Sequence, residues 1–158
     1  MLEFNSKGLL IPNTMIESSV DELKECLVDN ITSKTRLEIF NKYLAYSNSL
    51  KVLLGVVSIK QWINGSFVTK IANPRDIDLV SFVDYKLVEK VGDKLIAFNK
   101  EAIEDKMLDT YFVVVYPKGH SKEIFYSSDL AYWIDRFDTT RRDRKGIKNN
   151  KGFLEIIY

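Results

Sequence analysis

The chain is built around two predicted β-strands, residues 59–64 and 76–83, which are joined by a segment that starts with a Gly-Ser pair. The apolar content of the second strand predicts that it lies inside a sheet. Because side chains alternate between the two faces of a strand, Asp76 and Asp78 are expected on one face, while Ile77 and Leu79 enter the core. This order of strand, turn and strand restricts the chain to folds that contain a sheet.

The two aspartates and the Gly-Ser pair together indicate nucleotide chemistry. Two close carboxylates repel each other unless a cation lies between them, and Mg²⁺ prefers carboxylate oxygens together with substrate phosphate oxygens. Gly65 allows the backbone to approach a ligand closely, and the N–H groups of the helix expected after it suit phosphate. Nine residues separate Ser66 from Asp76. We therefore interpret the segment as a unit that binds a metal ion and phosphate.

The overall composition predicts one globular domain that spans residues 1–158, since 46% of the residues are hydrophobic. A net charge of +1 argues against binding of nucleic acid by bulk charge. Cys26 is the only cysteine and His120 the only histidine, which excludes an intrachain disulfide and a zinc site with several histidines. No leader-like start and no apolar stretch long enough to cross a bilayer occur, so a cytoplasmic location without membrane insertion is expected.

The first long helix is predicted over about 35–48. Thr35 and Glu38 have the spacing of a capping box at its start. Residues 50–57 are apolar and either extend this helix or form a separate segment. Its expected buried stripe consists of Leu37, Phe40 and Leu44.

Two further helices are predicted from apolar residues at helical spacing. One continuous helix is expected over about 86–106, with Gly92 as a mild weakness inside it. The other is expected to begin with Ser127 or Ser128 as its cap. Its buried stripe consists of Leu130, Trp133, Ile134 and Phe137.

Two more strands complete the predicted fold. Residues 109–116 are β-branched and aromatic almost throughout and stop at Pro117. Residues 153–158 are predicted to be a terminal strand that is exposed as an edge and able to pair with another chain. The resulting fold class is α/β (α+β), with a small mixed β-sheet flanked by helices.

The spacing of the glycine and aspartate motifs resembles the signature of the polymerase-β-like nucleotidyltransferase superfamily. That signature is a Gly-Gly or Gly-Ser turn, followed at short distance by Asp-x-Asp with apolar flanks. Further segments resemble a small stand-alone bacterial group of poorly characterised members within that superfamily. The matching segments are Gly8-x-x-x-Pro12, Gly65-Ser66-Phe67-Val68-Thr69, Pro74-x-Asp76-Ile77-Asp78, Asp109-x-Tyr111-Phe112-Val113 and Lys145-Gly146-Ile147.

The resemblance implies a nucleotidyltransferase-like fold and a metal-dependent transfer of a nucleoside monophosphate from an NTP or a dNTP. In the superfamily two Mg²⁺ ions, for which Mn²⁺ can substitute, stabilise the attacking and leaving oxygens. Asp76 and Asp78 would hold both ions. Asp109 heads the strand at which the superfamily places a third carboxylate, and it would complete the site.

The resemblance also implies which residues would bind the triphosphate. Ser66 and the N–H groups after Gly65 would hold the β- and γ-phosphates. Lys70 or Lys60 would neutralise charge on the leaving pyrophosphate. The chain departs from the superfamily at Thr69-Lys70, where many members carry a further glycine.

The acceptor stays open at this stage, because the chain lacks the extra domains with which larger members hold one. An RNA or DNA end, a partner protein encoded nearby and a second nucleotide all fit. The basic residues of 141–151 are either a solvated face or a contact to nucleotide or RNA. Small stand-alone members work in toxin–antitoxin or phage-defence systems, and the resemblance implies that context.

Two other hypotheses compete with an active enzyme. In the first, the protein is a catalytically weak binding module with the same fold, which acts as an antitoxin or as a nucleotide sensor. Such a module would bind a triphosphate without releasing pyrophosphate. In the second, the glycine and aspartate motifs are coincidental.

Overall fold

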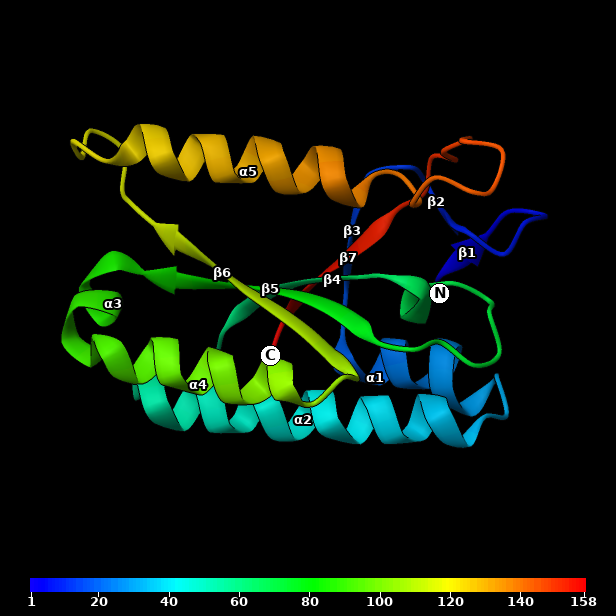
Figure 1. Ribbon diagram of the computed structural model, residues 1–158, viewed down its shortest axis with the longest axis horizontal. Coiled ribbons are helices and arrows are strands. Elements are labelled where there is room, and N and C mark those ends of the chain that lie inside the picture. Colours follow the sequence, from blue (N-terminus) through cyan, green and yellow to red (C-terminus); the bar gives the residue numbers. More distant parts are fainter.

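The computed structural model describes residues 1–158 and contains a five-stranded mixed sheet with helices on both faces (Figure 1). The strand order is β3-β7-β4-β5-β6, in which β4 is antiparallel to both neighbours and the two outer pairs are parallel. The expected class, α+β with a small mixed sheet flanked by helices, is confirmed. The strands are β3 (Met15–Ser18), β7 (Phe153–Ile157), β4 (Lys60–Asn64), β5 (Ile77–Asp84) and β6 (Leu108–Val115).

The helices form two layers around this sheet. Figure 1 shows α5 alone on one face and α1, α2 and α4 on the other. None of these helices has both the length and the apolar character that a membrane crossing requires. The remaining elements are the antiparallel pair β1 (Glu3–Phe4) and β2 (Leu10–Ile11), α1 (Val20–Lys24) with a π-helical turn Glu25–Asp29, α2 (Lys34–Leu54), a 3₁₀ turn Ser66–Val68, α3 (Tyr85–Val91), α4 (Asp93–Glu104) and α5 (Glu123–Phe137).

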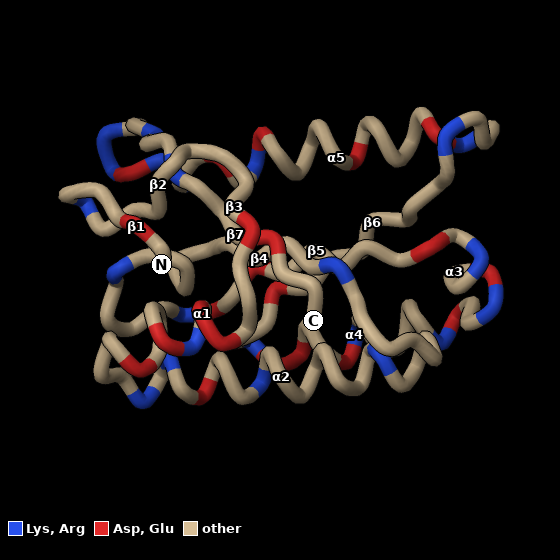
Figure 2. Tube along the Cα trace, turned by 180° about the vertical axis from the view of Figure 1, so that it is seen from behind, with Lys and Arg blue, Asp and Glu red and all other residues tan.

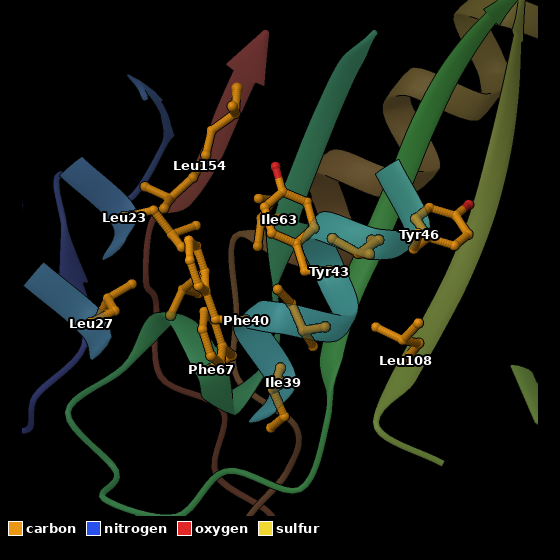
Figure 3. Packing of buried hydrophobic residues seen from close by; sticks show 14 of the residues in the cluster. Leu23, Leu27, Ile39, Phe40, Tyr43, Tyr46, Ile63, Phe67, Leu108 and Leu154 are labelled. Atoms are coloured by element: carbon orange, nitrogen blue, oxygen red, sulfur yellow. The ribbon is translucent and has the colours of Figure 1, made fainter. Parts of the chain in front are cut away.

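Two apolar cores hold these layers together. The larger core lies on the side of α2, where Phe40 and Tyr43 pack with Ile63 of β4 and Leu154 of β7 (Figure 3). The smaller core lies beneath α5 and consists of Trp62, Val80, Phe82, Val113, Trp133, Phe137 and Phe153. Because β4 and β5 contribute to both cores, they are buried on both faces, as the apolar content of β5 predicted.

The capping box predicted for α2 is wrong. The helix begins at Lys34, and Ser33 caps it by accepting a hydrogen bond from the Arg36 N–H at 3.3 Å. Ser33 has extended backbone, so it provides the cap two residues before Thr35. The helix continues to Leu54, which settles that part of the apolar segment 50–57 extends it. Its buried face is also rotated, since Leu37 is 48% exposed.

The continuous helix predicted over 86–106 is two helices. α3 ends at Val91 and α4 begins at Asp93, and Gly92 between them has a φ of +53°. Only glycine adopts such a conformation without strain, so it breaks the helix rather than weakening it. The predicted apolar stripe is thereby divided between two elements.

The helix predicted to start at Ser127 or Ser128 begins earlier, at Glu123, and neither serine is its cap. The helix starts with Glu123 and includes three apolar or aromatic residues before the serines, Ile124, Phe125 and Tyr126. Trp133 and Phe137 are buried as expected, whereas Ile134 is 46% exposed.

The C-terminal strand is not an edge. β7 lies between β4 and β3, and β3 pairs with it in parallel from Met15 opposite Phe153. The predicted free edge is therefore wrong, because an N-terminal segment with a weak strand signal covers it. The edges of the sheet are β3 and β6.

The segments that contain the predicted functional residues meet at one end of the sheet. β4 ends there at Asn64, and β5, β6 and β7 all begin there. Helix α5 ends at the same place, since the side chain of Asn64 donates a hydrogen bond to the carbonyl of Phe137 at 3.2 Å. Residues more than 70 positions apart in the chain thus meet at this end.

Candidate functional site

Asp78 and Asp109 lie side by side on neighbouring strands. In the parallel pair of β5 and β6 they are directly opposite each other, and Asn64 is opposite Asp78 on the other side, in β4. Ile77 and Leu79 are fully buried, which confirms the predicted alternation. Asp76 lies just before β5, and its charge acts on Asp78. The strand register therefore brings together two carboxylates that are far apart in sequence.

The environment of Asp78 disfavours a bare negative charge. Burial, and after it the charges of Asp76 and Asp109, together raise the pKa of this carboxyl from 3.8 to about 6. Arg141 and Lys151 lower the pKa of Asp78, but they do not cancel the increase. A cation bound beside Asp78 would relieve both the desolvation and the repulsion.

Unpaired acceptor oxygens are concentrated around Asp78. Its Oδ1 is out of contact with solvent and has no hydrogen-bond donor, and the same holds for Oδ1 of Asn64 and Oδ1 of Asp138. These are three of the five buried side-chain atoms of the chain that lack a partner. Buried acceptors without a donor are costly, so this end of the sheet is suited to a ligand that supplies positive charge.

Gly65 packs its backbone directly against the Asp78 carboxylate. Its φ is +85°, and a Cβ at this position would lie 2.8 Å from Oδ2 of Asp78. The turn after β4 therefore depends on glycine for two reasons, the backbone conformation and the space.

Gly65→Ala is expected to lower the free energy of unfolding by about 2 kcal/mol or more, because backbone strain and the contact with Asp78 add. The measurement is urea denaturation. Gly119→Ala is the matched control, since Gly119 has a φ of +83° and open space where a Cβ would be. The control should lose only about 1 kcal/mol, the cost of the backbone conformation. Equal losses in both variants would show that the contact with Asp78 contributes nothing.

Ser66 starts a single 3₁₀ turn rather than a longer helix, and the N-cap of that turn is Gly65. The side chain of Ser66 makes no capping hydrogen bond. The residue lines a cavity of about 290 Å³ instead. Other lining residues are Thr69, Thr139, Thr140, Arg141 and Lys151, so hydroxyl groups and two cations surround the space.

Lys151 is a site residue that the sequence did not single out. It is only 4% exposed, and its ammonium group donates a hydrogen bond to the carbonyl of Gly65 at 3.0 Å. Burial lowers the pKa of Lys151 from 10.5 to about 8, and Arg141 acts in the same direction while Asp78 opposes them. In the sequence it is one of several cations in a polar run. The only local signal was its position next to the apolar strand β7.

The two lysines named from the sequence lie elsewhere. Lys70 is exposed, and its ammonium group lies 4.2 Å from the ring centre of Phe4, outside the lining of the cavity. Lys60 lies at the start of β4, where it forms an ion pair with Glu155 at 3.4 Å. Since β4 ends at Asn64 beside Asp78, Lys60 is at the opposite end of that strand.

Arg36 is a second residue that the sequence did not reveal. It is fully buried without a carboxylate partner, and burial lowers its pKa from 12.5 to about 10. Its guanidinium donates hydrogen bonds to four backbone carbonyls, those of Leu27, Phe67, Thr69 and Ile71. Three of these belong to the segment after Ser66, so Arg36 fixes the wall of the cavity.

Asp76, Asp78 and Asp109 do not form a converged set of three metal ligands. No group of three His, Cys, Asp or Glu side chains in the chain has the geometry to hold a metal ion. The pair Asp78 and Asp109 is held together by strand register, and Asp76 acts on it through its charge.

The fold and this site define an α+β protein with a cluster of carboxylates at one end of a mixed sheet. Residues 2–157 match a family of unknown function, DUF6932, and the chain belongs to that family. Comparisons with curated proteins and with solved structures gave no match.

Proposed function

We propose that the protein is a nucleotidyltransferase that depends on a divalent metal ion, transfers a nucleoside monophosphate from a nucleoside triphosphate to an acceptor hydroxyl, and releases pyrophosphate. The observation that carries this proposal is the environment of the Asp78 carboxylate. This carboxylate has an unpaired, solvent-shielded Oδ1, lies beside Asp109 and rests against the backbone of Gly65. A structural aspartate in the interior would have donors for both oxygens.

The residues fit a hard divalent cation. Asp78 offers a buried oxygen without a donor, and Asp76 and Asp109 add two carboxylates whose repulsion a cation would relieve. Asp78 and Asp109, which strand register holds side by side, would hold Mg²⁺ or Mn²⁺ together with phosphate oxygens of the substrate, and Asp76 would add its negative charge. When bound, such ions supply positive charge at the attacking and leaving oxygens.

The cavity beside Gly65 supports the assignment of the triphosphate. Ser66 provides a hydroxyl group, and Lys151 and Arg141 provide positive charge. We assign Lys151 to the triphosphate in place of Lys70, because only Lys151 lines this space. Its ammonium group is held in place by the Gly65 carbonyl, so little side-chain freedom is lost when phosphate binds.

The reaction is an in-line displacement at the α-phosphorus. A bond forms between the acceptor oxygen and phosphorus, and the bond to the bridging α–β oxygen breaks. Asp109, beside Asp78, accepts a hydrogen bond from the acceptor hydroxyl, orients it and takes its proton as the new bond to phosphorus forms. Lys151 and Arg141 balance the charge that develops on the departing pyrophosphate.

The test is transfer of label from α-labelled nucleotides by the purified protein. We expect transfer to one of several acceptor pools (RNA, DNA, protein), stoichiometric pyrophosphate release with Mg²⁺ or Mn²⁺, and none with EDTA. If no donor and acceptor yield pyrophosphate with either metal, the proposal fails. Tight triphosphate binding by calorimetry in the same samples would then favour the binding module, an antitoxin or nucleotide sensor, over the enzyme.

A further inference from the structure

A second cavity of about 380 Å³ adjoins the first at the end of α5. Thr139, Thr140 and Arg141 line both cavities, so the two spaces share a wall. Figure 2 shows the basic residues concentrated in the loop that follows α5. The lining of the second cavity includes Arg136, Arg142 and Lys148 in addition to Arg141.

The positive charges around this second cavity have no ionic partner. All five ion pairs of the chain involve Lys24, Lys42, Lys60 or the N-terminus. Arg142 donates a hydrogen bond only to the carbonyl of Gly146, within its own loop, at 2.9 Å. Asp135 is the single carboxylate in the lining, against four cations. Cations gathered in this way repel one another, and an anionic ligand with several charges would offset that repulsion.

An exposed aromatic ring lies in the same lining. Tyr132 is 56% exposed, although it packs edge-on against the buried Trp133 with ring centres 5.2 Å apart. The ring is thus held from one side and free on the other. Guanidinium groups beside an exposed aromatic ring are the combination with which proteins bind single-stranded nucleic acid, by phosphate contacts and base stacking.

We propose that this second cavity binds the end of a single-stranded nucleic acid, which is the acceptor of the transfer. The inference rests on the proposed function, since it names the acceptor for the site at Asp78. Arg136, Arg142 and Lys148 contact successive phosphates, and Tyr132 stacks on a base. Because Arg141 lines both cavities, the terminal hydroxyl would lie next to the cavity to which we assign the donor.

The charge pattern favours nucleic acid over an acidic protein segment as the acceptor. The cations continue from Lys151 through Arg141 to Lys148, which suits a ligand with evenly repeated charge. A carboxylate-rich peptide would leave the face of Tyr132 without a matching planar partner. Because the net charge of the chain is only +1, the attraction is local and belongs to this cavity.

The test is fluorescence anisotropy with a labelled single-stranded RNA and the DNA of the same sequence, with the full chain in EDTA at several salt concentrations. We expect binding that weakens with salt. The triple variant Arg136→Gln/Arg142→Gln/Lys148→Gln should bind at least tenfold more weakly, and its log–log salt slope should be shallower by about 2, from about 0.7 per phosphate contact. Tighter binding of either the RNA or the DNA supports the inference and shows whether the acceptor carries ribose or deoxyribose.

The matched control carries the same loss of charge at three lysines of α3 and of the segment before α5. Lys86→Gln/Lys118→Gln/Lys122→Gln should bind within about twofold of the parent, because these lysines are outside the second cavity. Tyr132→Ala should weaken binding by about tenfold, and Tyr132→Phe should restore it, since the aromatic face stacks.

Three outcomes would overturn the inference. These are equal effects of the two triple variants, displacement of the oligonucleotide by an equimolar nucleoside triphosphate, and label transfer to protein without any oligonucleotide binding. The last outcome leaves the proposed function intact. Conversely, oligonucleotide binding with the expected variant effects and no transfer to any acceptor supports this nucleic-acid site and contradicts the proposed enzyme.

Discussion

Asp78→Asn is expected to abolish pyrophosphate release and to raise the melting temperature of the metal-free protein at neutral pH. Activity should fall by at least about 10²- to 10³-fold, the usual cost of removing one electrostatic contact to a transition state. Stability should rise because the amide removes a charge that is unfavourable in the folded protein. The pKa increase from 3.8 to about 6 corresponds to an upper limit of about 3 kcal/mol, or a shift on the order of 5 to 10 °C.

The gain in stability from Asp78→Asn should depend on pH in a defined direction. Since the folded-state pKa of Asp78 is raised, the folded protein binds more protons than the unfolded chain between pH 3.8 and about 6. Its stability therefore falls as the pH rises through this window. Asp78→Asn does not lose stability in this way. The difference in stability between the variant and the parent protein should therefore be absent below pH 4 and complete above about pH 6.

Thermal melts in EDTA and in Mg²⁺, combined with the pyrophosphate assay, measure both parts of this prediction. Mg²⁺ should stabilise the parent protein and leave Asp78→Asn unchanged. Asp129→Asn, which removes an exposed carboxylate of α5, is the matched control and should leave activity and stability as in the parent. An active Asp78→Asn protein would show that the reaction does not need Asp78, and a variant that melts well below the parent in EDTA would show that Asp78 is structural.

Arg36→Met is expected to lower the free energy of unfolding by about 3 to 5 kcal/mol, because it leaves buried carbonyl groups without donors. The guanidinium bonds carbonyls of two separate segments, at Leu27 and at residues 67–71. For a chain of this length the melting temperature should fall by about 10 °C or more. Arg36→Lys should be intermediate, since an ammonium group keeps the charge but cannot bond all of these carbonyls together.

Urea and thermal denaturation measure this effect, and Arg75→Met is the matched control. Arg75 is exposed in the segment between Ser66 and β5, so its loss should change stability by less than about 0.5 kcal/mol. A loss below about 1 kcal/mol for Arg36→Met would mean that water replaces the guanidinium at the carbonyls. The wall of the cavity at Ser66 would then be supported by other contacts.

Much of the local structure could be predicted from the sequence. The strands at Trp62 and Leu79 and the alternation of Asp78 with its apolar neighbours follow from the pattern of a few adjacent residues. The errors occurred where a local pattern competes with contacts from elsewhere. Gly92 separates two helices that share an apolar stripe, and β3 covers the strand that was expected to be an edge.

The sequence by itself determined the Gly-Ser turn, the Asp-x-Asp pair and the faces on which these residues lie, because strand periodicity is a property of neighbouring residues. Only the tertiary structure decided that Asp109 lies beside Asp78, that Lys151 is buried against the backbone of Gly65 and that Arg36 holds the cavity wall. Pairing register and burial depend on contacts between residues that are far apart in the chain. For that reason a polar run in the sequence does not distinguish a solvated lysine from one that bonds the backbone of Gly65.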